Sequence, residues 1–207
     1  MKLNPGLAIA VATSLLFAAP LAAADAPSLS KADTARVTFL NYAQCTLQQR
    51  GDKARDAVSL FPDSRAEMDA LQALPASPCM KYSDVAFSTR LFRGALYTVM
   101  YQTRFTKGVP TITAPKPDFA AGADMALTLD QKAMVQLRDF ADCVVRRDGA
   151  NAHTVVIGPV GSAMEKAAFA ALTPDLDACM TQGQKIPFTK PVLVGLLAEV
   201  LYREAQA

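Results

Sequence analysis

The second half of this chain repeats the first, and this internal repeat constrains the fold more than any other feature. Similar residues recur in the same order from about Ala35 to Phe105 and from about Ala133 to Arg203. The clearest correspondences are Tyr42-Ala43-Gln44-Cys45 with Phe140-Ala141-Asp142-Cys143, Cys79-Met80 with Cys179-Met180, and Gly94 with Gly195. Self-similarity of this kind predicts two copies of one supersecondary unit.

The N-terminal residues have the pattern of a secretion signal. A positive start at Met1-Lys2 precedes the apolar residues 7–21 and the small residues Ala22-Ala23-Ala24. We expect cleavage after Ala24, so that residues 1–24 are a signal peptide and the mature chain is exported to the periplasm. The apolar run is shorter than the roughly 20 residues that span a bilayer. An uncleaved membrane anchor is the alternative.

The mature chain is expected to be almost neutral and to lack a transmembrane segment. Loss of the one charge on Lys2 lowers the formal net charge from +2 to +1. A chain without a basic surface does not attract nucleic acid, so we expect no nucleic-acid partner. No segment after the signal is long and apolar enough to span a bilayer.

The four cysteines predict two disulfides, because an oxidising compartment pairs thiols. Sequence alone does not choose among the three possible pairings. If one copy once folded alone, its two cysteines most simply bond to each other. This favours Cys45 with Cys79 and Cys143 with Cys179, and pairing between the copies is the alternative.

The apolar pattern of each copy predicts helices. In the second copy Met134, Leu137, Ala141 and Val144 recur at steps of three and four, which is typical of an amphipathic helix. Gly51 and Gly149 are predicted to stop the first helix of each copy. A short helix is expected near residues 55–60, whereas its counterpart near residues 153–157 is disfavoured by β-branched side chains.

Two capping boxes mark the start of the next helix in each copy. Ser64 with Glu67, and Ser162 with Glu165, have the spacing at which the serine caps the helix and the glutamate reaches back. Pro174, like Pro75, is predicted to lie just past this helix, which places the following cysteine in a loop.

The last helix of each copy, beginning near Thr89 or Thr189, is apolar on most sides and therefore requires burial all round. Gly94 and Gly195 interrupt these helices and predict a close helix crossing. We therefore expect an all-α fold in which two disulfide-closed repeats of three to four helices, residues 25–105 and 128–207, pack into one pseudo-symmetric domain. Residues 106–127, rich in proline and glycine, form an irregular connector.

Few residues suggest chemistry. His153 is the only histidine, and we expect it on the solvated surface, with no metal and no cofactor. Tyr101 and Tyr202 end the last helices and are interpreted as polar caps of the core, with phenols lining a cleft as the alternative. Residues 158–162, Gly-Pro-Val-Gly-Ser, could cradle an anion, but a plain helix start is favoured because a P-loop lysine is missing. Copper binding at the Cys-Met pairs would need free thiolates.

The segment Phe140-Ala-Asp-Cys-Val-Val-Arg-Arg-Asp148, with Leu201-Tyr202-Arg203-Glu204, resembles exported proteins of alphaproteobacteria, sphingomonad-like ones in particular. The resemblance covers most of the second copy and, more faintly, the first. It implies an envelope location and carries no activity with it.

The sequence contains no motif that identifies a function. The first hypothesis is a non-enzymatic periplasmic module that binds a protein partner or a small ligand at the seam between its copies. An enzyme with a cleft between the repeats, and a protein for stress tolerance or stability of the envelope, are the alternatives.

Overall fold

In the described residues of a computed structural model all regular secondary structure is helical, as predicted. These residues are 29–74, 78–79, 88–106, 108–123, 126–180 and 189–206, and the predicted signal peptide of residues 1–24 lies outside them. They form seven helices and no strand: α1 (Lys31–Ser59), α2 (Arg65–Gln72), α3 (Thr89–Arg104), α4 (Leu129–Arg147), α5 (Gly149–Ile157), α6 (Ala163–Cys179) and α7 (Lys190–Glu204). None of these helices is long and apolar enough to cross a bilayer.

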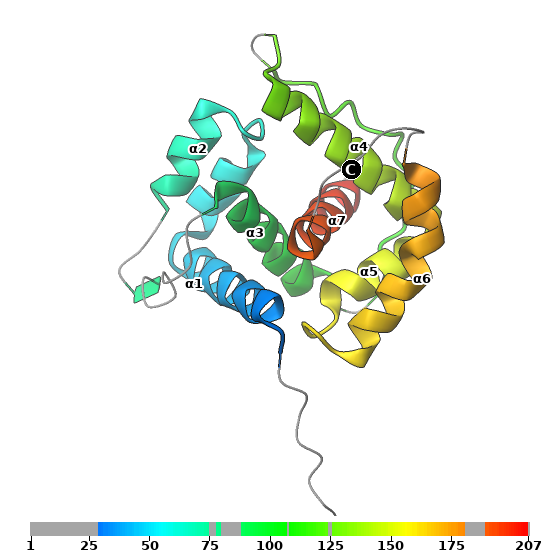
Figure 1. Ribbon diagram of the computed structural model, residues 1–207. Coiled ribbons are helices and arrows are strands. Elements are labelled where there is room, and N and C mark those ends of the chain that lie inside the picture. The colour runs from blue at the N-terminus through cyan, green and yellow to red at the C-terminus, as the bar shows by residue number, and fades with distance from the viewer. Residues whose placement is uncertain are drawn as a thin grey trace, which may run out of the picture.

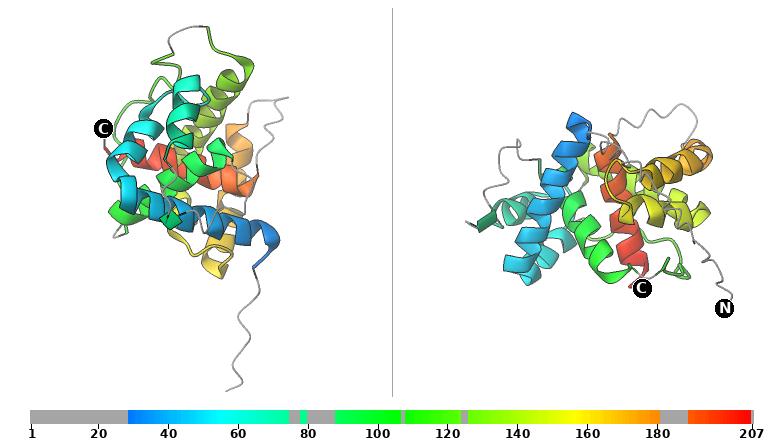
Figure 2. Two further views of the ribbon diagram at one scale, coloured as in Figure 1. Left: turned by 90° about the vertical axis from the view of Figure 1, so that its left-hand side faces the viewer. Right: turned by 90° about the horizontal axis from the view of Figure 1, so that it is seen from below.

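Helices α3 and α7 pack against each other at the centre of the fold (Figure 1). Helix α1 covers the outer side of α3, while α4 and α5 pack on α7 and α6 packs on α5. Figure 2 shows from below that α1, α3, α7 and the α5–α6 pair follow one another across the molecule. Half of the largest fully buried side chains come from the two central helices, among them Phe92, Leu96, Tyr101, Leu197 and Leu201.

The central crossing depends on two glycines. A Cβ atom added to Gly195 would lie 2.6 Å from the Cα atom of Gly94, and one added to Gly94 would lie 2.9 Å from the Cα atom of Gly195. Both obstacles are backbone atoms, which cannot turn aside as a flexible side chain can. The two helices therefore touch backbone to backbone at this point, which explains glycine in the middle of each helix.

Both disulfides have the pairing favoured from the sequence. Cys45 of α1 bonds to Cys79, and Cys143 of α4 bonds to Cys179 at the end of α6. The two bonds span 34 and 36 residues. By the chain-entropy estimate each contributes about 3 to 4 kcal/mol, a large share of the stability of a small domain.

The predicted stop at Gly51 is only a kink. Helix α1 runs on to Ser59, and the backbone leaves helical geometry at Arg50 alone, with φ −142° and ψ 39°. The second part persists because Ala54, Ala57 and Val58 are buried. At the equivalent place in the second copy, Asp148 has φ −141° and ψ 71° and separates α4 from α5.

Two further helix predictions were wrong. Residues 153–157 belong to α5, because burial of Ala152, Val155 and Val156 outweighs the weak helix propensity of β-branched side chains. Helix α6 continues through Pro174 to Cys179, so this cysteine is not in a loop. The proline leaves the carbonyl of Ala170 without its helical partner, and Ala170 is exposed, where water can donate to that carbonyl.

The connector between the copies lies over α4 and contributes to the core. Phe119 is buried, and Arg146 of α4 donates from Nη1 to the carbonyl oxygen of Ala114 at 2.8 Å. Lys116 pairs with Asp139 of the same helix at 2.7 Å. The described part of residues 106–127 has no helix, as expected, and it forms one wall of a pocket described below.

The glycine crossing can be tested by adding one methyl group. We expect Gly195→Ala to lower the free energy of unfolding by about 1 to 3 kcal/mol, because the overlap with the backbone of α3 exceeds the gain in helix propensity. Gly149→Ala is the control, since its Cβ would meet nothing closer than 4.0 Å. Urea unfolding followed by circular dichroism measures both. A Gly195→Ala protein as stable as the parent would contradict the contact.

Candidate functional site

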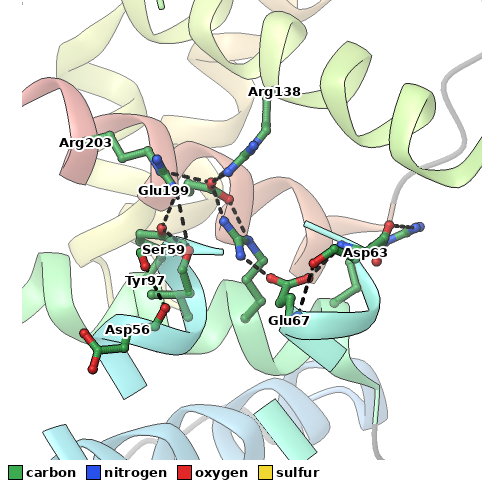
Figure 3. Close-up of polar contacts among 12 residues, drawn as sticks. Asp56, Ser59, Asp63, Glu67, Tyr97, Arg138, Glu199 and Arg203 are labelled. Atoms are coloured by element: carbon green, nitrogen blue, oxygen red, sulfur yellow. Dashed lines mark hydrogen bonds and ion pairs between the residues drawn. The ribbon is translucent and has the colours of Figure 1, made fainter. Parts of the chain in front are cut away.

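Three arginines surround a buried carboxylate in α7, that of Glu199. Glu199 accepts hydrogen bonds from Arg93 of α3, from Nε at 3.1 Å and from Nη2 at 2.8 Å. Arg138 of α4 donates to it from Nε at 2.9 Å and also from Nη2, and Arg203 Nε lies 3.2 Å from it in an ion pair. Figure 3 shows Arg138 and Arg203 approaching Glu199 from two different sides. We call Glu67, Arg93, Arg138, Glu199 and Arg203 the Glu199 cluster.

Glu67 and Glu165, the glutamates of the two predicted capping boxes, bond to the backbone just before their helices. Ser64 and Ser162 accept from the backbone N–H of Glu67 and Glu165, both at 3.1 Å. Each glutamate bonds one residue before the serine, to the N–H of Asp63 at 2.6 Å and of Gly161 at 2.8 Å.

The second oxygen of each of these carboxylates holds a buried arginine. Glu67 pairs with Arg93, and Glu165 pairs with Arg36. Glu165 also accepts from Lys190 at 2.8 Å. The glutamates therefore fix the helix starts to the core as well as capping them.

Burial and charge act against each other in the Glu199 cluster. Burial alone would raise the pKa of Glu199, but Arg93 and Arg138 outweigh it and hold that pKa far below its usual range. Burial raises the pKa of Glu67 in spite of Arg93. For Arg138, burial lowers the pKa, and the positive charges of Arg93 and Arg203 act in the same direction. The cluster is thus rich in positive charge.

Two arginines of this cluster line a pocket of about 790 Å³, which we call the seam pocket. The α1–α2 loop and the start of α2, in the first copy, form one side of it. The end of the connector, α4 and α7 form the other side. Its lining consists of residues 59–66 and 121–123 with Met68, Ala126, Thr128, Gln131, Arg138 and Arg203. The volume falls within the range of about 300 to 1,000 Å³ that is typical of small-molecule sites.

A second hollow also touches both copies. This apolar groove of about 200 Å³ lies between α1, α3 and the start of α7 and includes Ala32, Phe39, Leu91, Gly94 and Val194. Its charged lining residue is Arg36, which is paired with Glu165. The groove is smaller than the seam pocket and offers fewer polar groups.

His153 is buried, against the expectation that it is a solvated surface residue. Helix α5 carries it inward, where its Nδ1 lies 2.7 Å from the hydroxyl oxygen of Tyr101. Burial lowers the pKa of His153 and raises that of Tyr101. His153 lines neither of these two hollows.

The tyrosines at the ends of the last helices differ from each other. Tyr101 is fully buried and bonds to the histidine, rather than to water or a carbonyl. Tyr202 is half-buried and packs its edge on the ring of Tyr97, with centroids 5.9 Å apart. The hydroxyl of Tyr97 donates to the carbonyl of Val58 at 2.8 Å and accepts from Arg203 at the same distance.

The other candidate sites are occupied by the chain itself. The N–H of Gly161, in the loop that could cradle an anion, donates to Glu165, so a side-chain carboxylate holds that place. All four cysteines are in disulfides, which leaves no thiolate for copper. Within the described ranges no three His, Cys, Asp or Glu side chains gather as metal ligands would.

Sequence reasoning missed every arginine of the Glu199 cluster. A signal was present: Arg93 and Glu199 are charged residues inside helices that were predicted to be apolar on most sides and buried all round. A charge that must be buried requires a partner, and these two lie next to Gly94 and one turn after Gly195. The predicted crossing therefore could have placed them together.

The buried histidine gives a prediction on pH. Because burial lowers its pKa, we expect the single histidine resonance of the native protein to titrate below 6.5, its ordinary value. By linkage, the stability that neutral His153 contributes is fully present above pH 6.5 and is lost as the pH falls through and below that value. Proton NMR across a pH series measures the midpoint, with the urea-unfolded protein as the control. A native midpoint at or above the unfolded one would contradict the burial.

Comparison of the chain with known protein families, with curated proteins and with solved structures gives no match. No activity can therefore be transferred from a relative. What the protein does has to be inferred from its own pockets and charges.

Proposed function

We propose that this chain is a non-enzymatic binding module of the periplasm whose ligand site is the seam pocket. The observation that carries the proposal is that a hollow of about 790 Å³ is built jointly from the two sequence copies, with arginine side chains in its wall. Two disulfides are in keeping with an oxidising compartment, and the secretion signal expected from the sequence supports export.

We also propose that the two copies are pseudo-symmetric relatives that arose by duplication. Equivalent disulfides, equivalent serine caps at Ser64 and Ser162, and the mutual contact of Gly94 and Gly195 support this. The charges do not follow the repeat, because Thr98 stands where the second copy has Glu199. The seam pocket is therefore a feature of the pair of copies and is absent from either one alone.

Binding is favoured over catalysis by the kind of ionisable group that faces the pocket. Among the described residues these groups are Asp63, Arg65, Arg138 and Arg203. Asp63 is engaged by Arg90 at 2.6 Å, and the other three are arginines, which stay protonated and do not act as general bases. The enzyme alternative requires a cleft that gathers perturbed acids, tyrosines or His153, and neither His153 nor a tyrosine is among the described residues that line the seam pocket. The envelope stability alternative predicts that no ligand binds.

The test first finds ligands of the parent protein and then asks whether a variant with a blocked seam pocket still binds them. Saturation-transfer NMR of the purified protein with a mixed set of small aromatic fragments, neutral and charged, is expected to detect binders. Ala66→Trp, at an exposed position of the pocket lining, should abolish their binding. Ala32→Trp, the same change at an exposed lining position of the apolar groove, should leave it intact.

Three outcomes would contradict the proposal. One is that no fragment binds, which would favour the stability alternative. Another is that Ala66→Trp has no effect on the fragments that do bind. The third is that only Ala32→Trp abolishes binding, which would place the ligand in the apolar groove. Circular dichroism of both variants checks that each still folds.

A further inference from the structure

The Glu199 cluster contains more positive than negative charge. Three guanidinium groups, those of Arg93, Arg138 and Arg203, face two carboxylates, those of Glu67 and Glu199. Among the described residues the formal sum is one positive charge; Arg93 and Arg138 are almost completely buried, whereas the side chain of Arg203 is 38 % exposed. Water partly solvates this excess charge at Arg203, and an anion from outside the chain would offset the rest.

The excess positive charge lies on the side of the Glu199 cluster that faces the seam pocket. Arg93 is saturated between Glu67 and Glu199, whereas Arg138 and Arg203 line the pocket. Nε of Arg203 is buried and has no hydrogen-bond partner in the described part of the chain, although it lies near Glu199. Arg138 uses Nε and Nη2 on Glu199, and among the described residues its Nη1 has no hydrogen bond.

The other charges of the pocket are already engaged. Asp63 pairs with Arg90 at 2.6 Å, and Arg65 pairs with Asp69 of its own helix at 3.0 Å. Asp63, the carboxylate among the described lining residues, is therefore not available to Arg138 or Arg203. The remaining wall is largely apolar, with Leu60, Phe61, Pro62 and Met68 from the first copy.

We propose that the seam pocket binds a small organic anion whose oxyanion group is held by Arg138 and Arg203 and whose apolar body lies against Leu60, Phe61 and Met68. Guanidinium groups bind carboxylate and phosphate groups through several directed N–H bonds, which fits either kind of oxyanion. This inference rests on the proposed function and adds the chemical class of the ligand.

The test compares three ligands with the same ring: 2-naphthoate, 2-naphthyl phosphate and the neutral 2-naphthamide. Calorimetry of the full chain is expected to give at least tenfold tighter binding for one or both anions than for the amide. Arg203→Gln should reduce that preference to less than about threefold, while Arg203→Lys, which keeps the charge, should retain part of it. Arg55→Gln, an exposed arginine outside the pocket, should change nothing.

A preference of the phosphate over the carboxylate, or the reverse, identifies which oxyanion the site takes. If Arg203→Gln does not fold, competition on the parent protein replaces it, and inorganic phosphate should displace 2-naphthoate. Equal binding of the anions and the amide, or no effect of phosphate, would overturn the anion proposal and leave the pocket as a binding site. Absence of binding by all three ligands, together with no hit in the fragment search, would overturn the proposed function itself.

Discussion

The arrangement of the central helices depends on how the charge of Glu199 is compensated. A carboxylate that is 2 % exposed cannot remain ionised unless directed donors replace its water. Those donors are Arg93 of α3 and Arg138 of α4, while Arg203 of α7 itself adds an ion pair, so α3 and α4 are held in one position relative to α7. The backbone contact of Gly94 with Gly195 makes this possible, because it brings Arg93 and Glu199 across the same short crossing. The Arg93–Glu199 ion pair and the Gly94–Gly195 contact thus stabilise the same helix crossing.

The sequence predicted features whose signals are local or repeated. The all-helical class follows from apolar spacing, the disulfide pairing from the repeat, and the serine caps from four-residue motifs. Prediction from the sequence failed where long-range packing outweighs the local preference of the residues for a conformation. Helix α5 forms although its β-branched residues disfavour it, and this carries His153 into the interior. The lining of the seam pocket was beyond prediction, because it combines the α1–α2 loop and the connector with residues of α2, α4 and α7, which lie far apart in the chain.

The repeat and the charges have separate roles in this molecule. The repeated residues, cysteines, capping serines and crossing glycines, build a scaffold that either copy helps to complete. The arginines around Glu199 are not repeated, and they break the equivalence of the copies. Under the proposed duplication, substitutions in one copy would create a pocket at the seam while the shared features preserve the fold. The proposed anion site lies where this asymmetry is greatest.

The most direct test of this account is a double-mutant cycle between Arg93 and Glu199. Free energies of unfolding would be measured for Arg93→Met, Glu199→Gln and the protein with both changes. If the two groups hold the crossing together, each single change is strongly destabilising and the double change costs less than their sum by more than about 1 kcal/mol. Single effects that add within about 0.5 kcal/mol would show that the pair is energetically independent and would contradict the account.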